Sequence, residues 1–215
     1  MNIFASGQPA LVEDIHNICN EAGYIHNPDL PVDAVFDFHL ADLPAKRQFL
    51  ESVAADLIFT AAVPCSATEA ASWSVNPSRV IGISPVIGKT IEFAPALQTA
   101  PDVLAHGESL LRELGLQIVP VADGPGLVRL RILSCIINEA IATAADGVAS
   151  IQDIDAAMKL GANYPLGPLE WADTLTPEVV LAVMRALQYE YGEDRYRPTP
   201  LLVRKVQAKQ NLLAP

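Results

Sequence analysis

The chain has 215 residues, of which 51% are hydrophobic and 18% are charged, and its formal net charge is −11. A chain of this length forms one large domain or two small ones, and its hydrophobic fraction excludes an intrinsically disordered protein. The negative charge argues against a nucleic-acid partner, because proteins bind phosphates with Lys and Arg. It argues less strongly against anionic metabolites, since a single pocket on an acidic protein can still be positive.

Three cysteines, Cys19, Cys65 and Cys135, lack the close spacing of a metal site. We expect them to be reduced, as in a cytoplasmic protein. The first residues lack the basic and apolar regions of a signal peptide. The longest apolar stretch, residues 127–145, is interrupted by charged residues, which favours a buried helix over a membrane span. We therefore predict a cytoplasmic location and no membrane association.

The first half of the chain alternates between two kinds of hydrophobic pattern. Strands are predicted at residues 2–6, 34–38, 56–60, 80–83, 90–93 and 117–121, and helices at 11–22, 44–53, 66–73 and 102–114. Strands that alternate with helices predict a mostly parallel sheet with right-handed crossovers and with both faces covered.

The pattern changes after Ala122, where residues 123–126 (DGPG) interrupt it. Helices are predicted at 126–145, from Ser150 onward, at 169–175, at 177–191 and from residue 200, with no further strand. Ser150 and Asp153 have the spacing of a capping box. The sequence thus predicts an α/β domain over 1–122 and an all-helical domain over 123–215.

The segment at residues 125–173 resembles the C-terminal domain of the NAD-dependent 3-hydroxyacyl-CoA dehydrogenases. The specific motifs are NEA at 138–140, GVAS at 147–150, DID at 153–155, the block at 159–169, and DRYRP at 194–198 followed by PLL at 200–202. A weaker similarity continues through the first half.

The resemblance implies a Rossmann-type domain, shortened here, followed by a helical domain that forms a homodimer and lines an acyl-CoA cleft. It implies NAD-dependent oxidation of 3-hydroxyacyl-CoA in fatty-acid metabolism.

The dinucleotide-binding turn of such a family has the pattern G-x-G-x-x-G after the first strand. This chain has residues 5–10 (ASGQPA) at that place. The resemblance implies cofactor contacts from Gly7 and Gln8. The alternative is a plain strand-to-helix turn, because Ala5 adds a side chain and Pro9 lacks an amide hydrogen.

Two further residues are candidates for contact with NAD. Asp29 lies about 20 residues after the turn, where an acidic residue binds the cofactor ribose, although it sits in a proline-bounded loop. Lys46 matches a lysine that lies near the ribose in the family. The alternative for Lys46 is a solvated position on a helix face.

The family's catalytic histidine follows the fourth strand, and this chain has Ser84 there. Glu92 matches the carboxylate that would orient the histidine, and its alternative is an exposed or salt-bridged strand residue. The family's Asn-Thr-Ser-Ser segment is replaced by residues 61–64 (AAVP), and its substrate-contacting asparagine by Leu130. Ser84 and Arg131 remain as substrate-binding candidates. A long helical excursion before residues 34–38, which contributes to the acyl-CoA cleft in the family, is also missing.

Of the four histidines, His39 follows the second strand at its carboxyl end, where doubly wound sheets bind ligands. We therefore take His39, with Glu92, as a catalytic candidate. Paired metal ligands and a P-loop are missing from the sequence. Three hypotheses stay open. They are an active dehydrogenase with an altered site, a catalytically inactive dimeric relative that acts in binding or assembly, and a different activity on the same scaffold through His39 or Lys46.

Overall fold

The computed structural model describes residues 1–27, 30–85 and 88–212. It divides into two compact units, Met1–Val128 and Arg129–Pro215. We call them the N-terminal unit and the helical unit. The division falls a few residues after the boundary predicted near 122, because residues 123–128 bond to the N-terminal unit. Asp123, for example, accepts hydrogen bonds from the amides of Ala67 and Thr68 at 2.8 Å each.

In the described part of the N-terminal unit, six strands form one sheet in the order β1-β2-β3-β4-β5-β6. They are β1 (Ile3–Gly7), β2 (Ala34–Phe38), β3 (Leu57–Ala61), β4 (Val80–Ile83), β5 (Thr90–Pro95) and β6 (Gln117–Pro120). The β4–β5 pair is antiparallel and the other neighbouring pairs are parallel. The predicted α/β class with a mostly parallel sheet is confirmed.

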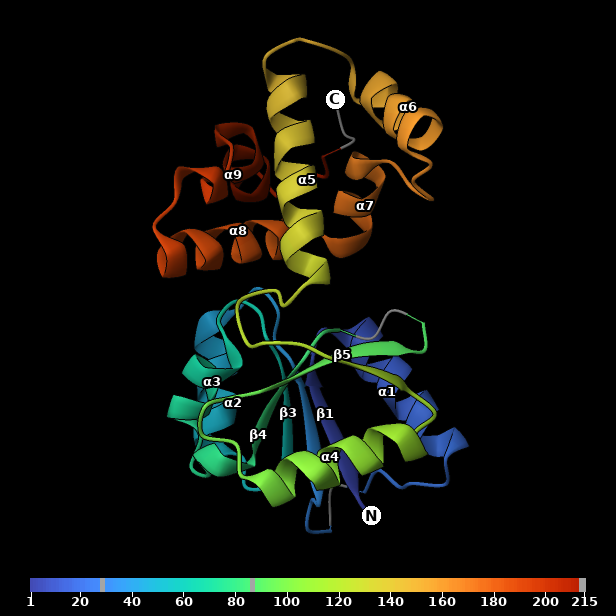
Figure 1. Cartoon of the computed structure of the whole chain (residues 1–215), viewed down its shortest axis with the longest axis vertical. Coiled ribbons are helices and arrows are strands. Elements are labelled where there is room, and N and C mark those ends of the chain that lie inside the picture. Colours follow the sequence, from blue (N-terminus) through green and yellow to red (C-terminus); the bar gives the residue numbers. More distant parts are fainter. Residues whose placement is uncertain (28–29, 86–87, 213–215) are drawn as a thin grey trace. The chain divides into compact units, whose positions relative to one another are not determined.

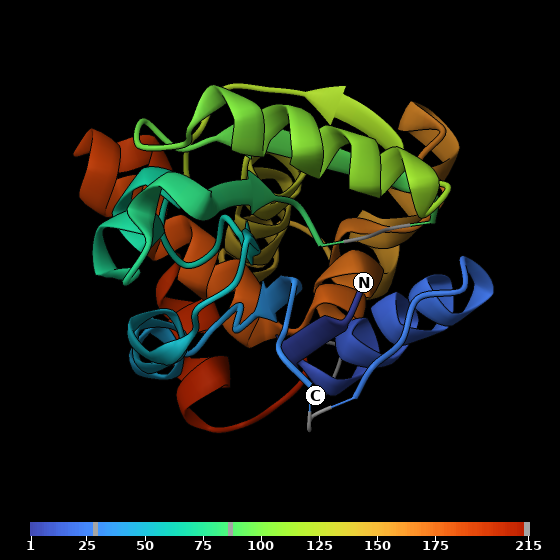
Figure 2. The same cartoon turned by 90° about the horizontal axis from the view of Figure 1, so that it is seen from below.

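Helices cover both faces of this sheet (Figures 1 and 2). They are α1 (Pro9–Glu21), α2 (Leu43–Ser52), α3 (Ala67–Trp73) and α4 (Pro101–Glu113). Helices α2 and α3 pack on Val35, Ile58 and Val80. Helix α4 lies on the opposite face, where its Gly107 closely approaches the Ile81 side chain. Helix α1 shares that second face with α4.

Helices α1 and α2 cover opposite faces because the chain leaves β1 in two directions. After α1 it forms a parallel bridge between Ile25 and Asn2 on one side of β1, and it then passes to β2 on the other side, from which α2 leads on to β3. Steps in opposite directions with helices on opposite faces have the same hand, which agrees with the predicted right-handed crossovers.

The helical unit contains α5 (Arg129–Ala145), α6 (Ile151–Ala162), α7 (Pro168–Leu175), α8 (Pro177–Tyr191) and α9 (Pro200–Gln207). Among its described residues there is no strand, so the predicted all-helical class is confirmed. Helix α5 begins later than predicted because Gly126 and Leu127 both have positive φ, at 75° and 48°. Across the described residues, no helix is both long and apolar enough to cross a membrane.

Buried polar side chains hold the connections of the helical unit. The Asp155 carboxylate accepts hydrogen bonds from the amides of Leu169 at 2.8 Å and Glu170 at 3.1 Å, which caps the first turn of α7. Asn138 accepts a bond from the Thr199 amide at 2.8 Å and donates to the Arg197 carbonyl at 3.1 Å. Each side chain satisfies backbone groups that a helix terminus or a loop leaves without a partner.

The Asp155 carboxylate packs closely against Gly167, and a substitution at Gly167 tests how close this packing is. A Cβ at Gly167 would lie 2.1 Å from Cγ of Asp155, whereas a Cβ at Gly161 meets nothing within 4 Å. We expect Gly167→Ala to lower the free energy of unfolding by at least about 2 kcal/mol, through loss of the cap and overpacking. Gly161→Ala, in a helix, is expected to raise it by about 0.5–1 kcal/mol. Urea denaturation of the two variants checks this, and equal effects would contradict the close fit.

His16 makes the stability of the N-terminal unit depend on pH. Its ring stacks on His26 at a centroid distance of 4.5 Å, and its Nε2 is buried with no hydrogen-bond partner among the described residues. Burial, and then the nearby His26, lower the pKa of His16 from the ordinary 6.5. The unfolded chain therefore takes up the proton first as the pH falls.

The contribution of His16 to stability should be complete above pH 6.5 and be lost as the pH falls through the lowered pKa. We expect the free energy of unfolding to decrease from about pH 7 to about pH 5.5. His16→Phe keeps an aromatic ring but cannot titrate, so its pH dependence in this range should be weaker. Denaturation curves at each pH measure the difference, and identical slopes would show that His16 is not responsible.

Candidate functional site

A cluster of polar side chains lies inside the N-terminal unit at the carboxyl ends of β2 and β3. The Asp37 side chain is fully buried and accepts hydrogen bonds from Lys46 Nζ and from Thr60 Oγ1, the latter at 2.6 Å. Burial alone would raise the pKa of Asp37, but the charge of Lys46 and the hydrogen bonds from His39, Lys46 and Thr60 outweigh it and lower the pKa. Asp37 is therefore held as a carboxylate.

His39 completes this cluster from the loop after β2. Its backbone amide and its ring Nδ1 both donate to Oδ1 of Asp37, at 3.0 and 2.7 Å. The His39 side chain is 17% exposed, whereas those of Asp37 and Lys46 are at 0%. His39 is thus the member of the cluster that reaches the surface, at the edge of the sheet where we expected it.

Lys46 does not lie on a solvated helix face, which was the alternative considered for it. The side chain of Lys46 is buried, and its ammonium group pairs with Asp37. It therefore acts within the fold, and a direct contact with a cofactor would require it to leave this ion pair. Asp37 and Thr60 were missed by sequence reasoning. The signal was a polar residue within each of the apolar strands AVFDF and LIFTA.

The turn after β1 does not fit a pyrophosphate cradle. Gly7 has a φ of 120°, and a Cβ there would lie 2.2 Å from the backbone of Phe38, so the turn packs directly against the end of β2. The Gln8 amide donates to the Phe38 carbonyl at 3.0 Å, and Pro9, the first residue of α1, has no amide hydrogen. Two of the amides around this helix terminus are thus unavailable to a phosphate. Asp29 lies outside the described residues.

Ser84 and Glu92 lie together at the junction of β4 and β5. The Glu92 amide donates to Ser84 Oγ at 2.9 Å, and the Ser84 amide donates to the Glu92 carbonyl at 3.1 Å. Glu92 is only 5% exposed, so the alternative of an exposed strand residue is wrong. Its carboxylate accepts a hydrogen bond from the Val128 amide at 3.3 Å, in the segment that leads out of this unit.

Arg131 belongs to the helical unit and holds two of its aromatic side chains. Its guanidinium donates to the hydroxyl of Tyr191 at 3.0 Å and to that of Tyr196. It also lies over both rings, at 4.5 and 5.3 Å from their centroids. The structure therefore gives Arg131 a packing role between α5, the end of α8 and the segment that follows α8, and the substrate contact stays a prediction.

Other reactive groups are less suited to chemistry. Burial raises the pKa of the Cys19 thiol to about 11 and that of Cys65 to about 12, so neither is a thiolate at neutral pH. Among the described residues, no three His, Cys, Asp or Glu side chains lie close enough together to hold a metal ion.

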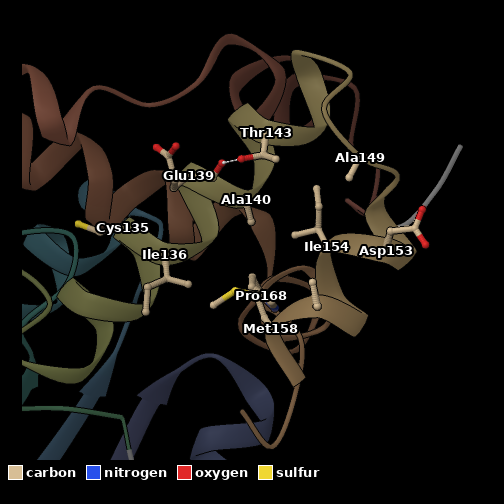
Figure 3. A pocket seen from close by; sticks show the side chains of 11 residues that line it. Cys135, Ile136, Glu139, Ala140, Thr143, Ala149, Asp153, Ile154, Met158 and Pro168 are labelled. Atoms are coloured by element: carbon tan, nitrogen blue, oxygen red, sulfur yellow. Dashed lines mark hydrogen bonds between the residues drawn. The ribbon is translucent and has the colours of Figure 1, made fainter. Parts of the chain in front are cut away.

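The helical unit carries an apolar groove between α5 and α6, with a volume of about 580 Å³ (Figure 3). Ile136 and Ala140 line it from α5, and Ile154 and Met158 from α6. The carboxylate of Asp153 points away from the middle of the groove in Figure 3. This surface suits an apolar partner.

The chain is similar in sequence to known dehydrogenases. The family model described as "3-hydroxyacyl-CoA dehydrogenase, C-terminal domain" matches residues 126–212. A 3-hydroxybutyryl-CoA dehydrogenase of Clostridioides difficile is 42% identical over 149 residues, which are 67% of this chain and 53% of that protein. One of Bradyrhizobium diazoefficiens is 38% identical over 147 residues, 66% of this chain and 50% of that protein. The chain thus spans about half the length of these curated relatives.

Among solved structures, the crystal structure of (S)-3-hydroxybutyryl-CoA dehydrogenase from Ralstonia eutropha matches with a TM-score of 0.81 and 25% identity. The match covers 97% of this chain and 94% of that one. The architecture of an α/β unit followed by a helical unit is therefore shared with a dehydrogenase of known structure.

The ion pair of Lys46 and Asp37 predicts a large difference between two neighbouring substitutions. Lys46→Met leaves the Asp37 carboxylate buried without its cation, which should lower the free energy of unfolding by about 3–5 kcal/mol. Arg47 pairs with Glu51 on the exposed side of the same helix. Arg47→Met should therefore change stability by less than about 0.5 kcal/mol. Urea denaturation measures both, and a small loss for Lys46→Met would contradict the buried pair.

Proposed function

Because the chain belongs to the 3-hydroxyacyl-CoA dehydrogenase family, we propose that it is a dehydrogenase-like protein that keeps the family scaffold without the usual hydride transfer. Its role would then be that of a relative that is inactive in the family reaction and acts in binding or assembly. The family reaction, NAD-dependent oxidation of 3-hydroxyacyl-CoA, needs a base for the 3-hydroxyl group and a bound nicotinamide.

The observation that supports this proposal most directly is the environment of Ser84. A serine hydroxyl cannot serve as a general base near neutral pH, and this one already accepts the amide hydrogen of Glu92. The Glu92 carboxylate, which would orient a histidine, accepts the Val128 amide instead. Loss of a general base alone typically costs about 10²–10⁴-fold in rate.

The turn at Gly7 supports the same conclusion for the cofactor. If NAD binds, its pyrophosphate meets a helix terminus where one amide is missing and another is engaged. We therefore propose that NAD and acyl-CoA bind weakly or not at all. We retain the cytoplasmic location as part of the proposal, on the three free cysteines.

The partner that we propose is a second copy of the chain, bound through the helical unit. The groove between α5 and α6 is apolar, and large side chains such as Leu160 are exposed on α6. Dimerisation through this apolar surface would remove the surface from water.

The proposed lack of the family reaction is tested with NADH and acetoacetyl-CoA. We expect no loss of NADH absorbance above that of buffer, and weak or no binding of either compound in calorimetry. A relative with an intact histidine serves as the positive control under the same conditions. Turnover that Glu92→Gln abolishes would contradict the proposal, because it would reveal an active dehydrogenase with an altered site.

The proposed dimer is tested by light scattering at micromolar protein concentration. The wild-type chain should have the mass of a dimer, and Met158→Glu, which places a charge in the groove, should shift it toward the monomer. Tyr189→Glu adds the same charge on α8, outside the groove, at a side chain that is 86% exposed, and should leave the mass unchanged. A monomeric wild-type protein would rule out the dimer.

A further inference from the structure

The buried cluster around Asp37 leaves one group open to a ligand. Both oxygens of the carboxylate are engaged inside the protein, Oδ1 by His39 and Oδ2 by Lys46 and Thr60. Lys46 and Thr60 are themselves buried, so neither can meet a ligand without a rearrangement. The His39 ring is the part of the cluster that is accessible.

The hydrogen bond to Asp37 determines the tautomer of His39. A carboxylate can only accept, so Nδ1 at 2.7 Å from Oδ1 must carry the hydrogen. In the neutral ring, Nε2 then presents its lone pair. No described residue donates to or accepts from Nε2, and the Phe49 ring, at a centroid distance of 5.4 Å, limits the rotation of the imidazole.

His39 also lies at a position where α/β sheets commonly bind ligands. It directly follows β2, at the carboxyl edge of the parallel strands, where ligands of open α/β sheets bind. The turn after β1 lies beside it, since Gly7 packs on the backbone of Phe38 and His39. A ligand at this edge would meet Nε2 together with the Gly7 turn.

We propose that His39 and Asp37 form a general acid–base pair whose ligand is a molecule that bears a hydroxyl group, or an ester or thioester attacked by water. Asp37 is the positioning residue, and His39 is the group that exchanges the proton. This centre lies apart from Ser84 and Glu92, and it does not require a nicotinamide. An experiment that refutes this acid–base pair therefore leaves the proposal about hydride transfer unaffected, and the reverse also holds.

The proton transfer can be written for a simple ester. Nε2 of His39 takes a proton from a water molecule while the water oxygen adds to the ester carbonyl. The bond to the leaving alkoxide or phenolate then breaks, and a carboxylic acid forms. The imidazolium, stabilised by Asp37, returns its proton to the leaving group or to solvent.

The buried ion pair fits this role better than a purely stabilising one. Replacement of a buried ion pair by apolar side chains of similar volume is often neutral or stabilising, so burial of Lys46 and Asp37 is poorly explained by stability alone. A carboxylate that is held charged, and that fixes the tautomer of an accessible imidazole, is the arrangement of a base and its orienting residue.

The first measurement is the tautomer of His39 in the wild-type protein. A long-range ¹H–¹⁵N correlation spectrum at alkaline pH should show Nδ1 protonated and Nε2 unprotonated, with His39→Gln assigning the signal. His106 is exposed on α4 and serves as the reference for an ordinary imidazole. A spectrum with Nε2 protonated would overturn the proposal.

The second measurement is hydrolysis of p-nitrophenyl acetate by the full chain, followed by release of p-nitrophenolate. His39→Gln should lower the rate by about 10²-fold or more, the low end of general-base catalysis, whereas His106→Gln should leave it unchanged. Added imidazole should restore activity to His39→Ala in proportion to its concentration. Equal rates for the wild type and His39→Gln would overturn the proposal, as would a loss in His106→Gln of the same size.

Asp37→Asn removes the charge next to Lys46 and can prevent folding, so Thr60→Val is the second probe of the positioning role. It removes one donor to Asp37 and leaves the ion pair in place. We expect folded Thr60→Val to retain the His39 tautomer but to show a shifted pH profile for ester hydrolysis. An unchanged pH profile would argue against a carboxylate that acts through His39.

Discussion

The buried carboxylate of Asp37 is the interaction on which the carboxyl edge of the sheet depends. A charge inside a parallel sheet is tolerated only when its oxygens are hydrogen-bonded and its charge is paired. The donors come from different elements, Lys46 from α2, Thr60 from β3 and His39 from the loop after β2. The same contacts therefore hold α2 against the sheet and orient the one ring of the cluster that reaches the surface.

The order of the strands identifies the position at this edge where doubly wound sheets bind ligands. In doubly wound sheets the ligand crevice forms where the strand order reverses. Here β1 to β6 follow one another, and on the far side of β1 the described chain has an isolated bridge between Asn2 and Ile25 in place of a strand. The chain thus lies on one side of β1 at Ile25 and on the other side at β2, so the order reverses at β1. The turn at Gly7, beside this point, packs on the backbone of Phe38 and His39. The helical excursion of the family, which is missing here, would fall between Ile25 and β2.

Hydrophobic periodicity was sufficient to predict the α/β and all-helical halves, because each element is long enough to show its period. The buried polar cluster could not be predicted in the same way. Lys46 lies on an amphipathic helix whose next residue, Arg47, is exposed, and no local pattern tells the two apart. Their difference comes from Asp37, on the preceding strand.

The strong family resemblance in the helical unit has a physical explanation that is independent of any reaction. Asn138 and Asp155 belong to the motifs that carry it, Arg131 lies in the same matching segment, and each of them bonds to groups of its own unit. Asp155 caps a helix, Asn138 bonds the loop at Arg197 and Thr199, and Arg131 holds two tyrosines. A chain that loses hydride transfer still needs these contacts to fold. A family match over residues 126–212 is therefore evidence for the shared fold of the helical unit. Any catalytic activity depends on other residues, such as Asp37 and His39 at the carboxyl edge of the sheet.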